Sequence, residues 1–251
     1  MNAENSSKRG MRRAWPGLVM VAVMTASSCA TTSLSPAPDV QTLPGAPDIA
    51  TSRVDDVEVT VQADAWKGDV AVTAAVQPVR VTINNNGDKP IRIRYSDFAL
   101  VSPAGHKYAA MPPFKVEGEI LSPALAVGYG AIMPRFAFRR FFIAPYYARI
   151  YPGIPVFSRR YQLYDPYYYD FYYLDLIRAI RPTVEMLGLA MPEGVIEPGG
   201  SLAGFLYFQR VDPDVPTVMF RQNLVSVGTE DGKGGASFGE ISIPFTVTTT
   251  R

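Results

Sequence analysis

The sequence predicts a mainly β protein, an antiparallel β-sandwich interrupted by an aromatic-rich, partly helical insertion. Two sets of alternating apolar and polar residues, one near residue 60 and one near the C-terminus, predict the strands, because successive side chains of a strand point to opposite faces. The 22 prolines and 20 glycines favour the many turns of an all-β chain. Residues 112–193 separate the two sets and predict the insertion.

The first set of strands begins near residue 54. Strands are expected over residues 57–65, 69–76, 79–95, 97–102 and 107–111. Within 79–95, the stretch Asn84–Asp88 separates two alternating halves, and Asn and Gly tolerate the backbone of a tight turn. SPAGHK at 102–107 predicts a second turn, in which His106 is a turn residue.

The second set of strands closes the domain. Strands are expected over residues 194–211, 217–228 and 237–249, with a turn around Pro198–Gly200 at the start of the first, a loop at 211–217 and a turn at 229–235. About seven short strands joined by polar turns favour a sandwich of immunoglobulin type. The chain lacks the Cys–Trp–Cys spacing of antibody domains, which excludes a true antibody-like domain.

Two stretches strengthen this fold assignment through a resemblance. VRVTINNNGDKPIRIRYSDFALVSPAGHKY (79–108) together with EPGGSLAGFLYFQRV (197–211) resembles the extracytoplasmic immunoglobulin-like domains of bacteria. The two stretches hold 45 residues, and the resemblance is one of fold only. It implies a fold and no function, because such domains serve many functions.

The N-terminus predicts a secretory signal over residues 1–28. A positively charged start precedes a short apolar run, residues 18–26, which is too short for a helix that spans a bilayer. Small residues then lead to Cys29. The positive residues are Lys8, Arg9, Arg12 and Arg13.

The end of this signal resembles the lipobox of bacterial lipoproteins, with Ala26–Ser28 before Cys29. The resemblance implies cleavage before Cys29, lipidation of Cys29 by a diacylglyceryl thioether and usually an N-acyl chain such as palmitate. More than one acyl chain gives stable anchoring. Ala30, by the same resemblance, implies the outer membrane of the cell envelope. The alternative is an ordinary signal peptide. Residues 29–52 are rich in Thr, Ser, Pro and Ala, so a disordered tether is expected.

The insertion is aromatic and ends in a helical pattern. Apolar residues recur at helical spacing in 172–194, at Leu174, Ile177, Ile180, Val184 and Leu187. Before them, the stretch YQLYDPYYYDFYYLDL (161–176) is half aromatic. Its tyrosines have four possible roles: packing against the sandwich, a protein-binding surface, contact with the membrane interface, or stacking on a glycan.

The composition argues against catalysis and against metal binding. One cysteine and one histidine exclude an internal disulfide and a Cys/His zinc cluster, and a net charge of +1 gives no reason to expect nucleic acid. We therefore expect a non-enzymatic, lipid-anchored envelope protein without cofactor or metal. It would bind another macromolecule through the candidate interface Arg159, Arg160, Tyr164, Tyr167, Tyr168, Tyr169, Phe171, Tyr172 and Tyr173.

Other functions stay open. In the main alternative, the protein is a structural or assembly accessory lipoprotein, and the insertion is only packing core. A glycan-binding module or a hydrolase fits the sequence less well, since no ordered polar set marks a sugar site and the usual nucleophile and base are missing.

Overall fold

The structure is a computed structural model, and it describes residues 31–113, 115–116, 119–120, 133–148, 150–157, 168, 184–227 and 235–250. These residues are mainly β. The strands are β1 Thr31–Pro36, β2 Thr42–Leu43, β3 Ala46–Val54, β4 Val57–Gln62, β5 Gln77–Asn85, β6 Ile91–Ile93, β7 Phe98–Val101, β8 Lys107–Met111, β9 Lys115–Val116, β10 Glu119–Ile120, β11 Ala137–Ile143, β12 Gly194–Phe208, β13 Thr217–Ser226 and β14 Ser237–Thr250. The helices are α1 Val70–Ala75 and α4 Val184–Leu189, with short 3₁₀ turns η1 Tyr95–Asp97 and η3 Pro145–Tyr147.

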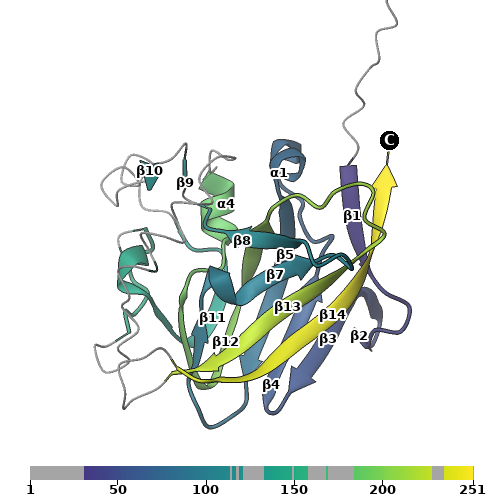
Figure 1. The fold of residues 1–251 in the computed structure, drawn as a ribbon. Helices are drawn as coiled ribbons and strands as arrows, with labels where there is room; N and C mark the ends of the chain where they lie inside the picture. The colour runs from purple at the N-terminus through teal and green to yellow at the C-terminus, as the bar shows by residue number, and fades with distance from the viewer. Residues whose placement is uncertain are drawn as a thin grey trace, which may run out of the picture.

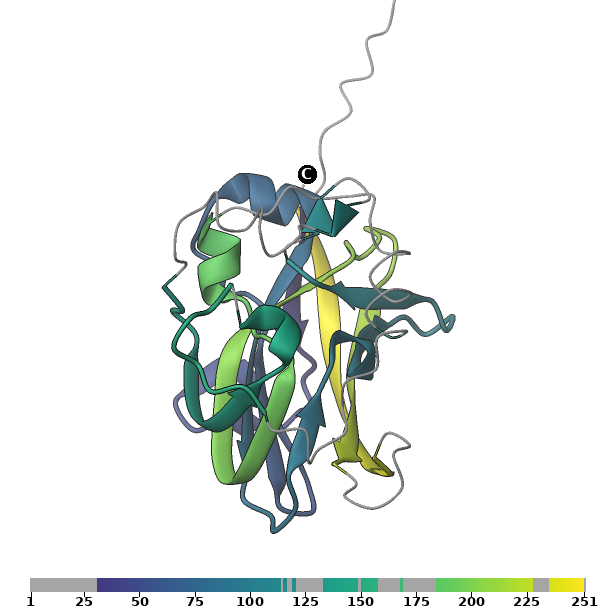
Figure 2. The same cartoon turned by 90° about the vertical axis from the view of Figure 1, so that its left-hand side faces the viewer.

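All but β9 and β10 join one antiparallel sheet that folds over on itself. Its path runs β1-β14-β13-β7-β8-β12-β5-β4-β3-β2, with β11 paired to β12, and β6 paired to both β12 and β13. Figures 1 and 2 show two facing layers, one with β3, β4, β5 and β12, the other with β7, β13 and β14. This arrangement confirms a mainly β, antiparallel protein consistent with a β-sandwich.

The long strand β12 joins the two halves of the fold. Its first residues, Gly194–Ile196, pair with β6 on one side and with β11 on the other. Its later part, Gly200–Phe208, pairs with β5. The predicted turn at 198–200 is therefore an irregularity within one strand, where Gly199 has φ of +69°. Gly tolerates this left-handed conformation because it has no Cβ.

The core lies between the layers and follows the predicted alternation. On β4, Val57, Val59 and Val61 are buried, while the residues between them are partly exposed. The largest fully buried side chains are aromatic: Tyr95, Tyr147, Tyr151, Tyr207, Phe141, Phe208, Phe220 and Phe245. Each ring buries a large area, so a few such side chains fill much of the space between the two layers.

The expectation of a flexible tether over residues 29–52 is wrong for the part that the structure describes. β1 pairs with β14 along its whole length, and β3 pairs with β4. Leu34 is only 3 % exposed, between the exposed Ser33 and Ser35. A chain rich in small polar residues orders here because β14 offers it an unpaired edge, which is a tertiary effect. The folded unit thus begins by Thr31, before the expected boundary at residue 53.

The strand expected at 69–76 is also wrong, because this segment forms helix α1. The Asp69 side chain accepts a hydrogen bond from the Ala71 N–H at 2.8 Å, as an N-cap does. Val72 and Val76 lie four positions apart and are both buried, so the segment carries a helical as well as an alternating pattern. Three alanines in α1, Ala71, Ala74 and Ala75, favour the helix.

Most other expected elements are confirmed. The strand at 107–111, the turn before it and the loop at 211–217 have the expected places, and Gly105 has φ of +84° in that turn. Twelve strands occur in the described sheet rather than about seven, and β1, β2, β3 and β11 are the strands outside the expected set. Of the helix expected within 172–194, the structure describes the part that forms α4. None of the described helices is long and apolar enough to cross a membrane.

Candidate functional site

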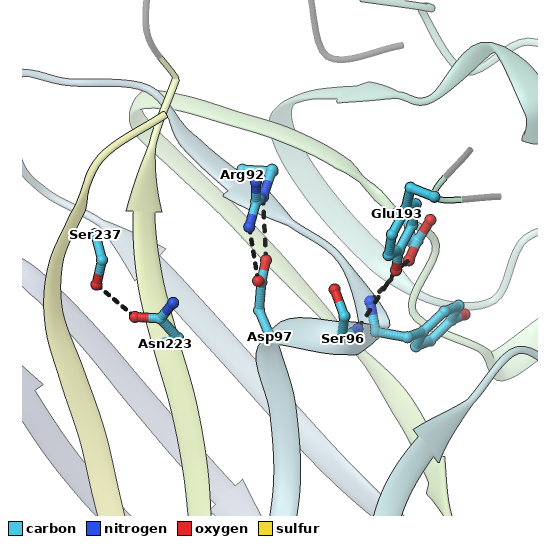
Figure 3. A network of polar contacts seen from close by, with 8 residues as sticks. Arg92, Ser96, Asp97, Glu193, Asn223 and Ser237 are labelled. Atoms are coloured by element: carbon cyan, nitrogen blue, oxygen red, sulfur yellow. Dashed lines mark hydrogen bonds and ion pairs between the residues drawn. The ribbon is translucent and has the colours of Figure 1, made fainter. Parts of the chain in front are cut away.

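A cluster of polar groups, with Tyr95, Asp97 and Glu193 buried at its centre, lies where β6, η1 and the start of β12 meet. We call it the Glu193 cluster; its members are Arg92, Arg94, Tyr95, Ser96, Asp97, Tyr168 and Glu193. Figure 3 shows the side chains that Arg92, Ser96, Asp97 and Glu193 contribute. Register explains the meeting: Gly194 is opposite Ile93 in the sheet, so Glu193 comes level with the residues that follow β6.

Glu193 is the centre of the cluster. It is 1 % exposed, and its Oε1 accepts hydrogen bonds from the Tyr95 N–H at 2.7 Å and from the Tyr168 hydroxyl at 2.6 Å. Its carbonyl oxygen accepts from the N–H of Ala144, which follows β11. A buried carboxyl group needs such partners to offset its loss of hydration. Glu193 thus connects three separate segments.

Tyr168 is held by two further contacts. Its ring lies under the Arg94 guanidinium, with 4.4 Å between the guanidinium carbon and the ring centroid. The Ser96 N–H approaches the Tyr168 hydroxyl oxygen at 3.4 Å. A guanidinium over an aromatic face is attractive because the face carries negative charge density. Tyr168 is partly buried and also packs against the main core, so this tyrosine contributes to holding the fold together.

Arg92 and Asp97 form the second part of the cluster. The Arg92 guanidinium donates to both Asp97 carboxylate oxygens, at 3.2 and 2.7 Å, and both side chains are largely buried. Burial raises the pKa of the Asp97 carboxyl, and the hydrogen bond and charge of Arg92 oppose that rise. The pair is a two-point contact in which the cost of removing both charges from water offsets much of their attraction.

Buried tyrosines beside the cluster bind backbone carbonyls. The hydroxyls of Tyr95, Tyr151 and Tyr207 donate to the carbonyls of Met191, Leu187 and Met186, respectively. Burial raises the pKa of each of these tyrosines. They stay neutral donors in any ordinary buffer, so they position α4 and the segment after it and do not serve as acids or bases.

One exposed face contrasts with this buried set. The first half of β11, Ala137–Arg140, is exposed, and the Phe138 side chain is 40 % exposed. Arg140 has φ of +48°, at a register shift between Arg139 and Phe141. A left-handed arginine is strained by roughly 1–3 kcal/mol, and such strain concentrates at functional sites. Phe138 still touches Phe136 and Phe141, which fix its position.

The structure reaches one of the nine predicted interface residues. Tyr168 is partly buried in the Glu193 cluster, where it packs against the sandwich. The others lie outside the described residues, as does Cys29: Arg159, Arg160, Tyr164, Tyr167, Tyr169, Phe171, Tyr172 and Tyr173. The predicted turn residue His106 donates its N–H to Ser102 Oγ, and its ring contacts Tyr108.

Sequence reasoning missed Glu193, Arg94 and the exposed β11. Glu193 stands in MPEGV, which has no motif, and only the pairing of β12 with β6 gives it its partners. The alternation of Arg with aromatics in 135–142 was the available signal for β11. Among the described residues, no group of three or more His, Cys, Asp or Glu side chains is placed to hold a metal ion.

Comparison with known proteins adds no relative. No protein-family model, no curated protein and no solved structure matches the chain. The geometry described above is therefore the basis for function.

Proposed function

We propose that this chain is a non-enzymatic, lipid-anchored protein of the bacterial envelope, at the outer membrane, that binds another macromolecule through its insertion. The observation that carries the proposal is the exposed half of β11, where Phe138 stands beside Arg139 and Arg140. Aromatic and arginine side chains are enriched at binding hot spots. The left-handed Arg140 keeps this strand bulged, a device often found beside binding sites.

Within the insertion, some aromatic side chains are buried and hold the exposed part of β11 in place. Phe141, Tyr147 and Tyr151 belong to the main core, and Tyr151 contacts Phe136 edge-on at 5.2 Å between ring centroids. Tyr168 is held by Glu193 and Arg94. A surface supported by packed rings is preorganised, so little conformational entropy is lost on binding. The candidate interface named above stays part of the proposal on sequence grounds.

Three further parts of the proposal, the absence of catalysis, the lipid anchor and the immunoglobulin-like fold, each rest on one observation. The buried carboxylates Asp97 and Glu193 are engaged by Arg92, Tyr95 and Tyr168, as structural acids are. The signal and lipobox-like residues before Cys29 support the anchor. The two facing antiparallel layers support an immunoglobulin-like sandwich with an aromatic, partly helical insertion.

The alternative is an accessory lipoprotein of structural or assembly type, in which the insertion is only core. The burial of Phe141, Tyr147 and Tyr151 favours it. The two proposals differ over Phe138, because a residue that only completes the core does not touch a partner.

The experiment is site-specific photo-crosslinking in intact cells. A benzoylphenylalanine at position 138 is compared with one at position 156, because the Phe138 and Val156 side chains are 40 % and 41 % exposed. We expect a discrete crosslinked product from position 138, absent from position 156 and lost when Arg139 and Arg140 are replaced by alanine. No product at position 138 would favour the accessory alternative, and equal yields at both positions would mean that contact is not specific to β11.

A further inference from the structure

One end of the sandwich gathers the start of β1, the end of β14 and helix α1. Thr31 pairs with Thr250, and the end of β12 pairs with the start of β5, which directly follows α1. The loop between β12 and β13 ties these parts together through three hydrogen bonds: Thr32 Oγ1 to the Val211 carbonyl, Thr249 Oγ1 to the Pro213 carbonyl, and Arg210 to the Ala74 carbonyl. Figure 1 shows α1, the start of β1 and the C-terminus at this same end.

The sequence leaves very little chain between this end and the expected lipid. Cys29 precedes Thr31, the first residue of β1, by two positions. Consecutive Cα atoms are about 3.8 Å apart, so the two residues lie within about 8 Å of each other. The polar layer on each side of a bilayer is itself roughly 5–8 Å thick. A lipid-bearing Cys29 at the acyl boundary therefore leaves no water layer between membrane and β1.

Helix α1 presents an apolar, uncharged surface at this end. The Val70 side chain is 78 % exposed, and Ala71 and Ala74 are exposed beside it. No residue of Val70–Ala75 is charged. An exposed valine next to exposed alanines on a helix suits the boundary between headgroups and acyl chains.

The helix is held firmly, so this surface has a defined direction. The Trp66 ring contacts Phe205 and Tyr207 edge-on, at 5.3 and 5.9 Å between centroids. Its indole N–H donates at 3.1 Å to the carbonyl of Asp69, the N-cap residue of α1. Val72 packs into the same buried cluster from the opposite side of the helix to Val70.

We propose that the α1 end of the sandwich rests directly on the bilayer, with Val70 and Ala74 in contact with lipid. This inference depends on the lipid anchor of the proposed function. Burying one valine contributes only about 1.5 kcal/mol, too little to hold a protein on a membrane alone. The acyl chains therefore supply the affinity, and the short connection and the apolar face supply the orientation.

Charge selects the kind of lipid surface. In the segments at this end, 64–69 and 210–214, the acidic residues Asp64, Asp69, Asp212 and Asp214 outnumber the basic Lys67 and Arg210. Glu185 adds a further acid, which accepts a hydrogen bond from the Asp69 N–H. Attraction to anionic lipids needs clustered basic residues. The orientation is thus expected on a zwitterionic bilayer, and the turns at the opposite end, near Asp55 and Gly87, extend into the aqueous phase.

The experiment measures the depth of a fluorescent label. Cys29 is the chain's one cysteine, so after lipidation a Val70→Cys variant offers a single free thiol for an environment-sensitive dye. The matched control is Asn86→Cys, exposed at the opposite end. Processed, lipidated protein is placed in phosphatidylcholine vesicles with and without brominated acyl chains. We expect brominated lipid to quench the dye at position 70 at least threefold more than the dye at position 86.

A spacer variant tests the role of the short connection. Twenty Gly/Ser residues between Ala30 and Thr31 have a root-mean-square reach of about 25 Å. We expect this variant to float with the vesicles as before, while quenching at position 70 falls to the level at position 86. The fluorescence of Trp66, the one tryptophan after the signal, reports that α1 remains packed.

The outcomes separate the inference from the function on which it rests. Failure of the unmodified protein to float with vesicles would overturn the lipid anchor. Flotation with equal quenching at positions 70 and 86 would overturn the orientation alone, and would assign the α1 face to water or to a protein. Undiminished quenching in the spacer variant would show that the short connection does not orient the domain.

Discussion

Tyr168 and Glu193 lie 25 positions apart in the chain, and the Tyr168 hydroxyl donates to Glu193 Oε1 at 2.6 Å. The same carboxyl oxygen accepts a hydrogen bond from the N–H of Tyr95, a residue that follows β6. One buried carboxyl group thus joins the tyrosine-rich segment to the sandwich. Tyr168 therefore holds the insertion to the sandwich. Among the described residues of the insertion, the exposed first half of β11 is the better candidate for a binding surface.

Removing the Tyr168 hydroxyl is expected to weaken this junction. Tyr168→Phe should lower the free energy of unfolding by about 1–3 kcal/mol, because a buried acceptor loses one of its hydrogen-bond partners. Urea denaturation of Tyr168→Phe, Glu193→Gln and the double variant measures their coupling. A coupling near zero would mean that the contact contributes nothing to stability.

Asp97 should titrate above its ordinary range. Burial favours its neutral form, so its folded pKa exceeds the unfolded value of about 3.9. Its contribution to stability therefore increases as pH falls through the folded pKa toward the unfolded value, and is lost as pH rises. Carbon NMR titration of the Asp97 carboxyl, assigned with Asp97→Asn, gives the pKa. Arg92→Met should raise it further; a fall would contradict the role of Arg92.

Gly194 is expected to tolerate no side chain. An added Cβ would overlap the Phe142 carbonyl oxygen and lie 2.5 Å from the Phe141 ring. Gly194→Ala should destabilise the protein by about 1–3 kcal/mol or more, since overpacking displaces backbone as well as side chains. Gly87→Ala is the control, because its nearest contact, Asn85 Oδ1, is at 3.4 Å. Thermal unfolding that ranks the two variants equally would refute the close β11–β12 approach.

Leu34 tests whether β1 is part of the folded domain. Leu34→Ala should lower the free energy of unfolding by about 2–5 kcal/mol, as for other buried leucines. Ser33→Ala, exposed on the same strand, should change it by less than about 0.5 kcal/mol. Denaturant titration of both variants gives the answer. Two neutral substitutions would restore the expectation of a flexible tether.

Comparing glycine substitutions at Arg140 and Asp55 distinguishes the effect of backbone strain from the effect on binding. Both have left-handed backbones, with φ of +48° and +49°, so glycine at either position should stabilise the fold by about 1 kcal/mol. Arg140→Gly should also abolish the crosslink from position 138, whereas Asp55→Gly should leave it intact. Calorimetry and crosslinking on the same samples measure both effects. Retained crosslinking in Arg140→Gly would remove the arginine from the proposed surface.

The sequence by itself determined the strands that alternate and the turns between them, such as β4, β8 and the turn through Gly105. Side-chain periodicity and turn chemistry are local, so they can be inferred without knowing any partner. Tertiary structure decided which segments become ordered and which side chains meet. Thr31–Pro36 became a strand because β14 offered it an edge, and Val70–Ala75 became a helix because Val72 and Val76 could be buried together.

The candidate site belongs to the second kind. Glu193 is one acid in a segment without a motif, and its partners come from η1, from Tyr168 and from the residue after β11. Those partners arrive through the register of β12 with β6 and β11, which depends on contacts between residues far apart in the chain. The composition of a short stretch contains no information on such pairings, so tyrosine content alone could not separate anchor from surface.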